Sequence, residues 1–327
     1  MFVRRLSAFV SAVIASTACI ASTSLKAAPT EEGKVIRVGM IGLDTSHVVA
    51  FTKTLNDPKS PADDLGARVV AAFKGGSPDV EASASRVDGY TKALREDWGI
   101  EIVDDIPTLC GKVDAVMLES VDGRPHLEQV RPVFAAKKPV FIDKPMAGSL
   151  ADVKEILRLS RESGVPCFCS SSYRFMKDLR RPDMGRIVGC EAYSPASLEP
   201  HHPDLFWYGI HGVEALFTTM GPGCVEVSRV HTPTMDVCVG RWKDGRIGVF
   251  RGFREGKAPS GIRVHCEKGS YDVAAGDYRG LMEAVVEFFR TGKSPVSPQE
   301  MLEIYAFMDA ADKSKVAGGK PTALDLK

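Results

Sequence analysis

Between residues 35 and 170 the sequence alternates short apolar runs with amphipathic segments, and this alternation constrains the fold more than any other feature. The segments between the runs carry apolar residues at helical spacing, as Val48, Phe51 and Leu55 do. Such alternation predicts right-handed β–α–β units and a doubly wound parallel sheet. The predicted strands cover residues 35–41, 68–73, 100–103, 113–119, 140–142 and 166–170.

After about residue 175 strands follow one another with few helices between them. Hairpin turns at residues 244–245 and 268–269 separate neighbouring strands. This pattern predicts a second, α+β domain over residues 176–327, whose largely antiparallel sheet has an open face that favours a homo-oligomer. One helix is expected over residues 208–220, and two final helices, near 281–290 and 298–315, are expected to pack back on the first domain. The predicted strands cover residues 190–194, 225–230, 236–242, 247–252, 262–267 and 270–273.

The fifth predicted strand of the first domain ends in Asp143, Lys144 and Pro145. Ligands bind at the carboxyl ends of strands in open α/β sheets, so this strand brings a charged pair to the binding edge. Pro145 keeps Lys144 extended. An ammonium held beside a carboxylate can position a hydroxyl or share its proton in redox chemistry. The alternative is a surface Lys-Pro turn, and the surrounding pattern argues against it.

The first predicted strand ends in a turn where a dinucleotide fold places its glycine-rich phosphate loop. Gly39 and Gly42 fit that loop, and Thr45, Ser46 and His47 follow as further candidate cofactor-binding residues. Asp44 occupies the second glycine position, where a carboxylate adds bulk and repels phosphate. Residues 44–46 could equally serve as N-cap residues of the next helix.

Residues after the second and fourth strands are the other candidates for binding a dinucleotide. Lys74 and Ser77 stand where an NAD site usually has an acid, so they favour a 2′-phosphate and hence NADP over NAD. Ser120 would face the nicotinamide half of the cofactor, with His126 a few residues later. A histidine near a helix start is more often a capping or packing residue than a catalytic one, and both interpretations stay open.

A second group of candidates lies between residues 201 and 214. Tyr208 and His211 are three residues apart, so a helix would place them on one face. An imidazole is a natural acceptor for a hydroxyl proton when a hydride leaves the same carbon. His211 and Glu214 repeat the spacing, but two ligands make a poor metal site, and we predict no metal.

The charge balance argues against nucleic-acid binding, and the N-terminal residues predict export from the cytoplasm. Lys+Arg and Asp+Glu both number 42, so the chain lacks the basic surface that nucleic-acid binding requires. An arginine pair, a weakly apolar run and small residues over residues 1–28 predict a signal peptide, whose arginines hint at the twin-arginine route. The run is too polar for a stable membrane span. We expect most of the eight cysteines to be buried free thiols.

These features together resemble the glucose–fructose oxidoreductase / inositol dehydrogenase / MocA family over essentially the whole mature chain. The most specific element is Asp143-Lys144-Pro145, similar to that family's Glu-Lys-Pro, and residues 173–175 after the sixth strand also look familial. The resemblance implies a Rossmann-type first domain, NADP or NAD as cofactor, and Arg174 among the cofactor-binding residues. It also implies Lys144 at the nicotinamide and His211 as acid/base.

The sequence departs from the family pattern at three places. Trp207 stands where the aspartate of an Asp-x-x-x-His pattern is expected, Asp44 replaces a glycine, and Lys74 replaces the usual acid. Our leading hypothesis is an exported oxidoreductase that acts on a sugar, a cyclitol or a derivative, with Lys144, His211 and Tyr208 at the reacting carbon. The alternatives are a glycosidase that uses transient oxidation by a bound cofactor, and a carbohydrate-binding protein without activity.

We predict that the mature protein begins between Ala21 and Pro29 and lies outside the cytoplasm, because the first 28 residues have the order of a cleaved signal. Mass-spectrometric sequencing of the N-terminus from fractionated cells measures this. A chain that starts at Met1 in the soluble cytoplasmic fraction would contradict it.

Overall fold

The structure is a computed structural model, and it describes residues 34–59, 65–274 and 276–327. The predicted signal peptide lies outside the described residues. Among the helices of the described part, none combines the length and apolar character that a membrane span requires.

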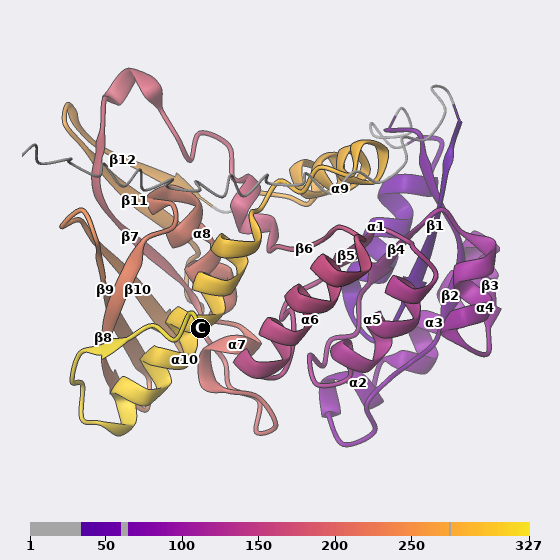
Figure 1. Cartoon of the computed structure of the whole chain (residues 1–327), viewed down its shortest axis with the longest axis horizontal. Coiled ribbons are helices and arrows are strands. Elements are labelled where there is room, and N and C mark those ends of the chain that lie inside the picture. Colours follow the sequence, from indigo (N-terminus) through magenta and orange to yellow (C-terminus); the bar gives the residue numbers. More distant parts are fainter. Residues whose placement is uncertain (1–33, 60–64, 275) are drawn as a thin grey trace, which may run out of the picture.

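The first half of the chain forms a six-stranded parallel sheet with the order β3-β2-β1-β4-β5-β6, which confirms the predicted doubly wound fold (Figure 1). Each strand pairs in parallel with its neighbours. All residues of β4 and β5 are buried, as expected for strands with helices on both faces. The strands are β1 (Ile36–Ile41), β2 (Ala67–Phe73), β3 (Glu101–Val103), β4 (Ala115–Leu118), β5 (Val140–Ile142) and β6 (Cys167–Cys169).

Helices pack on both faces of this sheet. α1 contacts α3, whereas α4, α5 and α6 contact one another in sequence. The start of α6 follows from its sequence, since Ser149 Oγ accepts a hydrogen bond from Asp152 N and Gly164 ends the helix at φ 69°. The helices are α1 (Ser46–Asn56), α2 (Glu81–Ala84), α3 (Val87–Trp98), α4 (Ile106–Lys112), α5 (His126–Ala135) and α6 (Leu150–Ser163).

The second half forms a seven-stranded sheet with the order β12-β11-β7-β10-β9-β8-β13. The sheet is largely antiparallel as predicted, with one parallel pair between β10 and β7. The predicted strands are present, and β13 is an addition that the sequence did not indicate. The strands are β7 (Ile187–Pro195), β8 (Cys224–Thr232), β9 (Met235–Trp242), β10 (Ile247–Phe253), β11 (Gly261–Cys266), β12 (Gly269–Ala274) and β13 (Thr322–Ala323).

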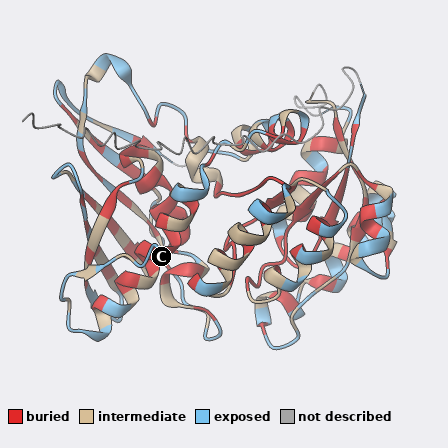
Figure 2. Cartoon of the chain, viewed as in Figure 1, coloured by how far each residue is buried: buried red, intermediate tan, exposed pale blue. Residues whose placement is uncertain are grey.

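Helices α8 and α10 cover one face of this second sheet, and their buried residues form its core (Figure 2). The helix predicted over residues 208–220 begins two residues later, since Gly209 separates a short α7 from α8. The helices are α7 (Asp204–Trp207), α8 (Ile210–Met220), α9 (Arg279–Thr291) and α10 (Pro298–Val316).

The two last helices also contact the first sheet and its helices. The buried Tyr305 hydroxyl on α10 accepts a 2.6 Å hydrogen bond from Met146 N, just after β5. Phe288 on α9 packs edge-on against Phe168 of β6, with ring centroids 4.9 Å apart. These contacts hold the carboxyl edge of the first sheet against the second half of the chain. The exact domain limits stay a prediction.

The cysteines of the described residues are all buried free thiols, seven in number, which confirms that expectation for this part of the chain. A thiol buried among apolar side chains has a high pKa and packs as a small hydrophobic group. Burial raises the pKa of Cys167 to about 11.

We predict that Gly212→Ala destabilises the protein by about 1–3 kcal/mol, because overpacking a filled core has that cost. A Cβ at Gly212 on α8 would lie 2.3 Å from Phe250 Cε2 of the sheet. The matched control is Gly89→Ala on α3, where a Cβ meets nothing within 4 Å and the helix gains up to about 1 kcal/mol. Urea unfolding of both variants measures the difference, and equal stabilities would contradict the packing argument.

Candidate active site

A cavity of about 210 Å³ lies where the carboxyl edge of the first sheet meets the second half of the chain. Small-molecule sites usually measure about 300–1,000 Å³, so this cavity accepts one ring-sized group and not a whole dinucleotide. Its wall combines hydroxyls, aromatic rings and cations from both halves. The lining residues are Thr45, Ser46, His47, Arg86, Val121, Lys144, Ser172, Tyr173, Trp207, Tyr208, His211 and Tyr278.

The three residues predicted to be catalytic lie together in this cavity. Lys144 projects from the end of β5, and its Nζ lies 5.8 Å from the centroid of the Tyr208 ring. Tyr208 in turn contacts His211 edge-on, with centroids 5.0 Å apart. Tyr208 lies in the turn that leads into α8, where Gly209 is helical and His211 N donates a hydrogen bond to Tyr208 O, so the two rings meet one turn apart as the spacing suggested.

His211 is nearly buried and is held from behind by polar groups that the sequence did not indicate. Its Nδ1 lies 2.6 Å from Ser171 Oγ, just before the 3₁₀ turn η2 (Ser172–Phe175). Burial lowers the pKa of His211 well below 6.5, and the nearby charges of Lys144 and His47 lower it further. The imidazole is therefore neutral at pH 7 and can accept a proton.

Arg174, predicted to bind the cofactor, lies instead behind His211. Its guanidinium pairs with Glu214 on α8 at 2.5 Å and with Glu300 on α10 at 2.7 Å. Glu214 also accepts a hydrogen bond from Ser170 Oγ. Arg174 thus ties η2 to two helices and fixes the wall that carries His211, which is a positioning role.

The turn after β1 keeps the main feature of a phosphate loop. Gly42 has φ 84°, and a Cβ there would lie 2.2 Å from Ser120 Oγ, so only glycine fits. Thr45 caps α1 by accepting a hydrogen bond from His47 N. Gly39, by contrast, lies within β1, and a Cβ there would meet the side chain of Leu109.

Asp44, which replaces a fingerprint glycine, is fully buried, and its carboxylate does not cap the helix. It accepts hydrogen bonds from Ser83 Oγ at 2.6 Å and from Val121 N at 2.8 Å. The carboxylate is therefore directed at α2 and at the loop after β4, not at the N-terminus of α1. Because the Asp44 carboxylate points away from the N-terminus of α1, it is not directed at a phosphate group bound there.

The lining of this cavity suits the nicotinamide end of a dinucleotide and one of its phosphate groups. The N-terminus of α1 and the side chains of Ser46 and Arg86 offer amide groups, a hydroxyl and a positive charge along one side of the cavity. The aromatic rings of Tyr173, Tyr208 and Tyr278 line the ring-sized part. The N-terminus of α1 with Ser46 and Arg86 would hold a phosphate group, and the three tyrosines would hold a flat ring.

Several other predicted cofactor residues lie away from the cavity. Lys74 Nζ pairs with Asp88 at 2.6 Å in an exposed, weak ion pair, and this contact does not decide between NADP and NAD. Ser77 N donates a hydrogen bond to Ser83 Oγ, and Ser120 Oγ donates one to Gln129. His126 is fully buried between the carbonyls of Ser120 and Met146, which is the packing role left open above.

Under the cavity floor lies a buried acidic cluster that sequence reasoning recognised only in part. Asp143 Oδ2 lies 2.6 Å from His47 Nδ1. Glu119, at the end of β4, is fully buried, and neither of its carboxylate oxygens has a hydrogen-bond partner within the described part of the chain. Burial raises the pKa of Glu119 well above its usual value, and Asp143 and Asp44 raise it further against the opposing charge of Lys144.

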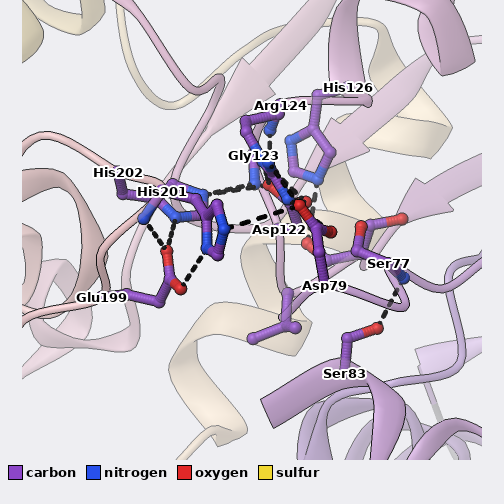
Figure 3. Close-up of polar contacts among 12 residues, drawn as sticks. Ser77, Asp79, Ser83, Asp122, Gly123, Arg124, His126, Glu199, His201 and His202 are labelled. Carbon is purple, nitrogen blue, oxygen red and sulfur yellow. Dashed lines mark hydrogen bonds and ion pairs between the residues drawn. The ribbon is translucent and has the colours of Figure 1, made fainter. Parts of the chain in front are cut away.

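Beside the cavity, a second polar network joins the loop before α7 to the loop after β4 (Figure 3). His202 lies between Asp122 at 3.1 Å and Glu199 at 2.7 Å, and its side chain is fully buried. Arg124 pairs with both Asp122 and Asp79 at 2.8–2.9 Å. Trp207, which stands where the family has an aspartate, packs on the His202 ring at 4.9 Å.

We predict that this network makes stability depend on pH. Burial opposes the charge on His202, but Asp122 and Glu199 outweigh it and raise the pKa of His202 above 6.5. Its contribution is thus fully present below pH 6.5 and is lost as pH rises through the higher folded-state pKa. His202→Gln should cost about 1–3 kcal/mol at pH 6 and less at pH 8.5.

Thermal unfolding of the variant and the parent at both pH values measures the effect. The half-buried His265, whose Nδ1 lies 2.8 Å from Ser270 Oγ and which has no carboxylate hydrogen-bond partner among the described residues, provides the control His265→Gln. A stability difference for His202→Gln that does not change with pH would contradict the assignment.

Comparison with known proteins finds a family match for the first half of the chain. Residues 36–171 match the model of an oxidoreductase family with an NAD-binding Rossmann fold, named GFO_IDH_MocA. Among curated proteins, no sequence match was found.

Solved structures with the same fold include dehydrogenases of cyclitols. Myo-inositol 2-dehydrogenase from Lactobacillus plantarum superposes with a TM-score of 0.72 at 15% identity, over 89% of this chain and 100% of that one. Scyllo-inositol dehydrogenase from Lactobacillus casei, with bound NAD(H) and scyllo-inositol, gives 0.69 at 13% identity over 89% and 99%. An oxidoreductase from Agrobacterium radiobacter in complex with NAD+, L-tartaric acid and magnesium gives 0.67 at 15% identity over 89% and 98%. At these identities the likeness shows the fold.

Proposed function

We propose, on the premise that this chain belongs through residues 36–171 to the Gfo/Idh/MocA oxidoreductase family, that it is an exported NAD-dependent oxidoreductase acting on a ring carbon of a sugar or cyclitol. One observation carries the proposal: Lys144, His211 and Tyr208 line a single ring-sized cavity. The cyclitol dehydrogenases among the structures with this fold support the substrate class. The signal-like order of residues 1–28 supports export.

The side chains of the cavity have complementary roles toward a polyol. His211 is neutral and buried, so it accepts the proton of the reacting hydroxyl. In the tautomer required, Nδ1–H donates to Ser171 Oγ, which leaves Nε2 as the acceptor. Lys144 carries a positive charge that stabilises the oxygen as it loses its proton. Tyr208 and Tyr173 offer aromatic faces on which one side of a sugar ring packs.

The cofactor would be held by the N-terminus of α1 with Ser46 and Arg86, and it supplies the hydride acceptor when bound. The chain itself limits the access of water to the reacting carbon, since the His211 and Lys144 side chains are both buried. Closing the site in this way strengthens every charge interaction inside it. We take NAD as the cofactor, because the matching family model describes an NAD-binding Rossmann fold.

We predict that His211→Ala lowers turnover about a hundredfold or more, with a smaller effect on substrate binding, because the general base is lost. Lys144→Ala should lower both turnover and binding. The exposed His231→Ala on β8 is the control. Reduction of NAD with a panel of cyclitols and sugars measures this, and the acid limb of kcat/KM should lie below pH 6.5, where His211 becomes protonated.

The same assay separates the rival functions. Release of a sugar from a glycoside without net reduction of NAD would favour the glycosidase. Saturable sugar binding without turnover or retained nucleotide would favour the binding protein. If neither NAD nor any sugar binds the folded chain, the proposed function is wrong.

A further inference from the structure

The acidic cluster beneath the cavity differs from the other buried polar groups of the described chain in having an unpaired carboxylate at its centre. His47, Glu119 and Asp143 each offer one ligand atom, and these atoms lie within 4.8 Å of one another. They come from three different segments: the start of α1 and the ends of β4 and β5. The residues meet only because their strands are neighbours in the sheet.

Glu119 is the observation that points to a ligand. Its side chain is fully buried, and both oxygens lack partners within the described residues. Burying a carboxylate without a partner costs several kcal/mol, so such groups are normally paired or bind a metal. The other charged groups around Glu119 are Asp143, which pairs with His47, together with Asp44 and Lys144. A divalent cation would give the Glu119 oxygens the partner that they lack.

We propose that His47, Glu119 and Asp143 form a binding site for a divalent transition-metal ion. One imidazole and two carboxylates are ligands that suit Zn²⁺, Mn²⁺ or Fe²⁺. Metal–ligand bonds of about 2.0–2.2 Å require ligand atoms roughly 3–4.4 Å apart. His47 Nδ1 and Asp143 Oδ2 are 2.6 Å apart and all three ligand atoms lie within 4.8 Å of one another, so small side-chain movements form the site.

The cavity provides the route of entry and the open coordination positions. The His47 side chain is 12% exposed and lines the cavity, whereas Glu119 is fully buried. Binding displaces the proton between His47 Nδ1 and Asp143 Oδ2 and the proton of the Glu119 carboxyl group, and both leave to solvent. The ion would then lie next to Lys144 and the ring-sized space, where an oxygen of a polyol or acid could complete its coordination.

The test uses the whole mature chain, purified without immobilised metal, treated with a chelator and titrated with MnCl₂ while electron paramagnetic resonance reports free Mn²⁺. We expect one site per chain, with Zn²⁺ displacing the Mn²⁺. Glu119→Gln and Asp143→Asn should each weaken binding at least tenfold, since even changes outside the ligand set cost about 10–100-fold.

The matched control is Glu303→Gln, another buried carboxylate, which accepts hydrogen bonds from Gly223 N and Gln299 Nε2 far along the chain on α10. It should bind Mn²⁺ as the parent does. Circular dichroism checks folding, and His47→Gln at the cavity wall replaces any variant that fails to fold. No saturable binding of Mn²⁺ or Zn²⁺ by the folded parent, or equal binding by the ligand variants, would overturn the proposal.

This inference does not depend on the proposed function, and NAD(H) binding measured on the same samples separates the two. A chain that binds Mn²⁺ but neither NAD nor a sugar would leave the metal site standing and overturn the proposed activity. A chain that binds and reduces NAD but binds no metal would support the proposed activity and overturn the metal site.

Discussion

The whole site depends on the in-register pairing of three parallel strands. Ile41 at the end of β1 pairs with Leu118 at the end of β4, and Leu118 pairs with Ile142 at the end of β5. Since parallel strands end at one edge, the residues that follow them are forced together. The edge therefore gathers Asp44, His47, Glu119, Asp143 and Lys144 although they are spread over a hundred residues of sequence.

Such an edge is unstable as an open surface, because it holds carboxylates and backbone groups that no sheet neighbour satisfies. The chain resolves this in two ways. Asp44 is satisfied locally by Ser83 and Val121. The rest is covered by the second half, where Tyr305 accepts a hydrogen bond from Met146 N and His202 bonds across to Asp122. Glu119 alone stays unsatisfied among these carboxylates, which is why it carries the metal proposal.

The covering half also determines the chemistry available in the cavity. Arg174 holds Glu214 and Glu300 together, and this fixes α8 against η2. Ser171 Oγ then lies 2.6 Å from His211 Nδ1 and sets the orientation of the imidazole. Trp207 fills the former aspartate position and packs against His202. Trp207 thus has a packing partner in His202, and His211 has a hydrogen-bond partner in Ser171, although the aspartate of the family pattern is absent.

The sequence by itself determined the fold, since the alternation of apolar strands and capped helices leaves few topologies that bury both faces of a parallel sheet. It also predicted that Lys144 and His211 face one cavity, as they do, because a strand end and an early helix of the second half both lead to the same edge. It could not show that Lys74 is paired with Asp88, that His126 is packed between two carbonyls, or that Arg174 lies behind His211. Those outcomes depend on contacts between side chains distant in sequence, and only the tertiary structure decided them. Glu119 is the clearest case: within its strand it is an ordinary residue at a strand end, and it becomes a candidate ligand only when β1 and β5 bring His47 and Asp143 beside it.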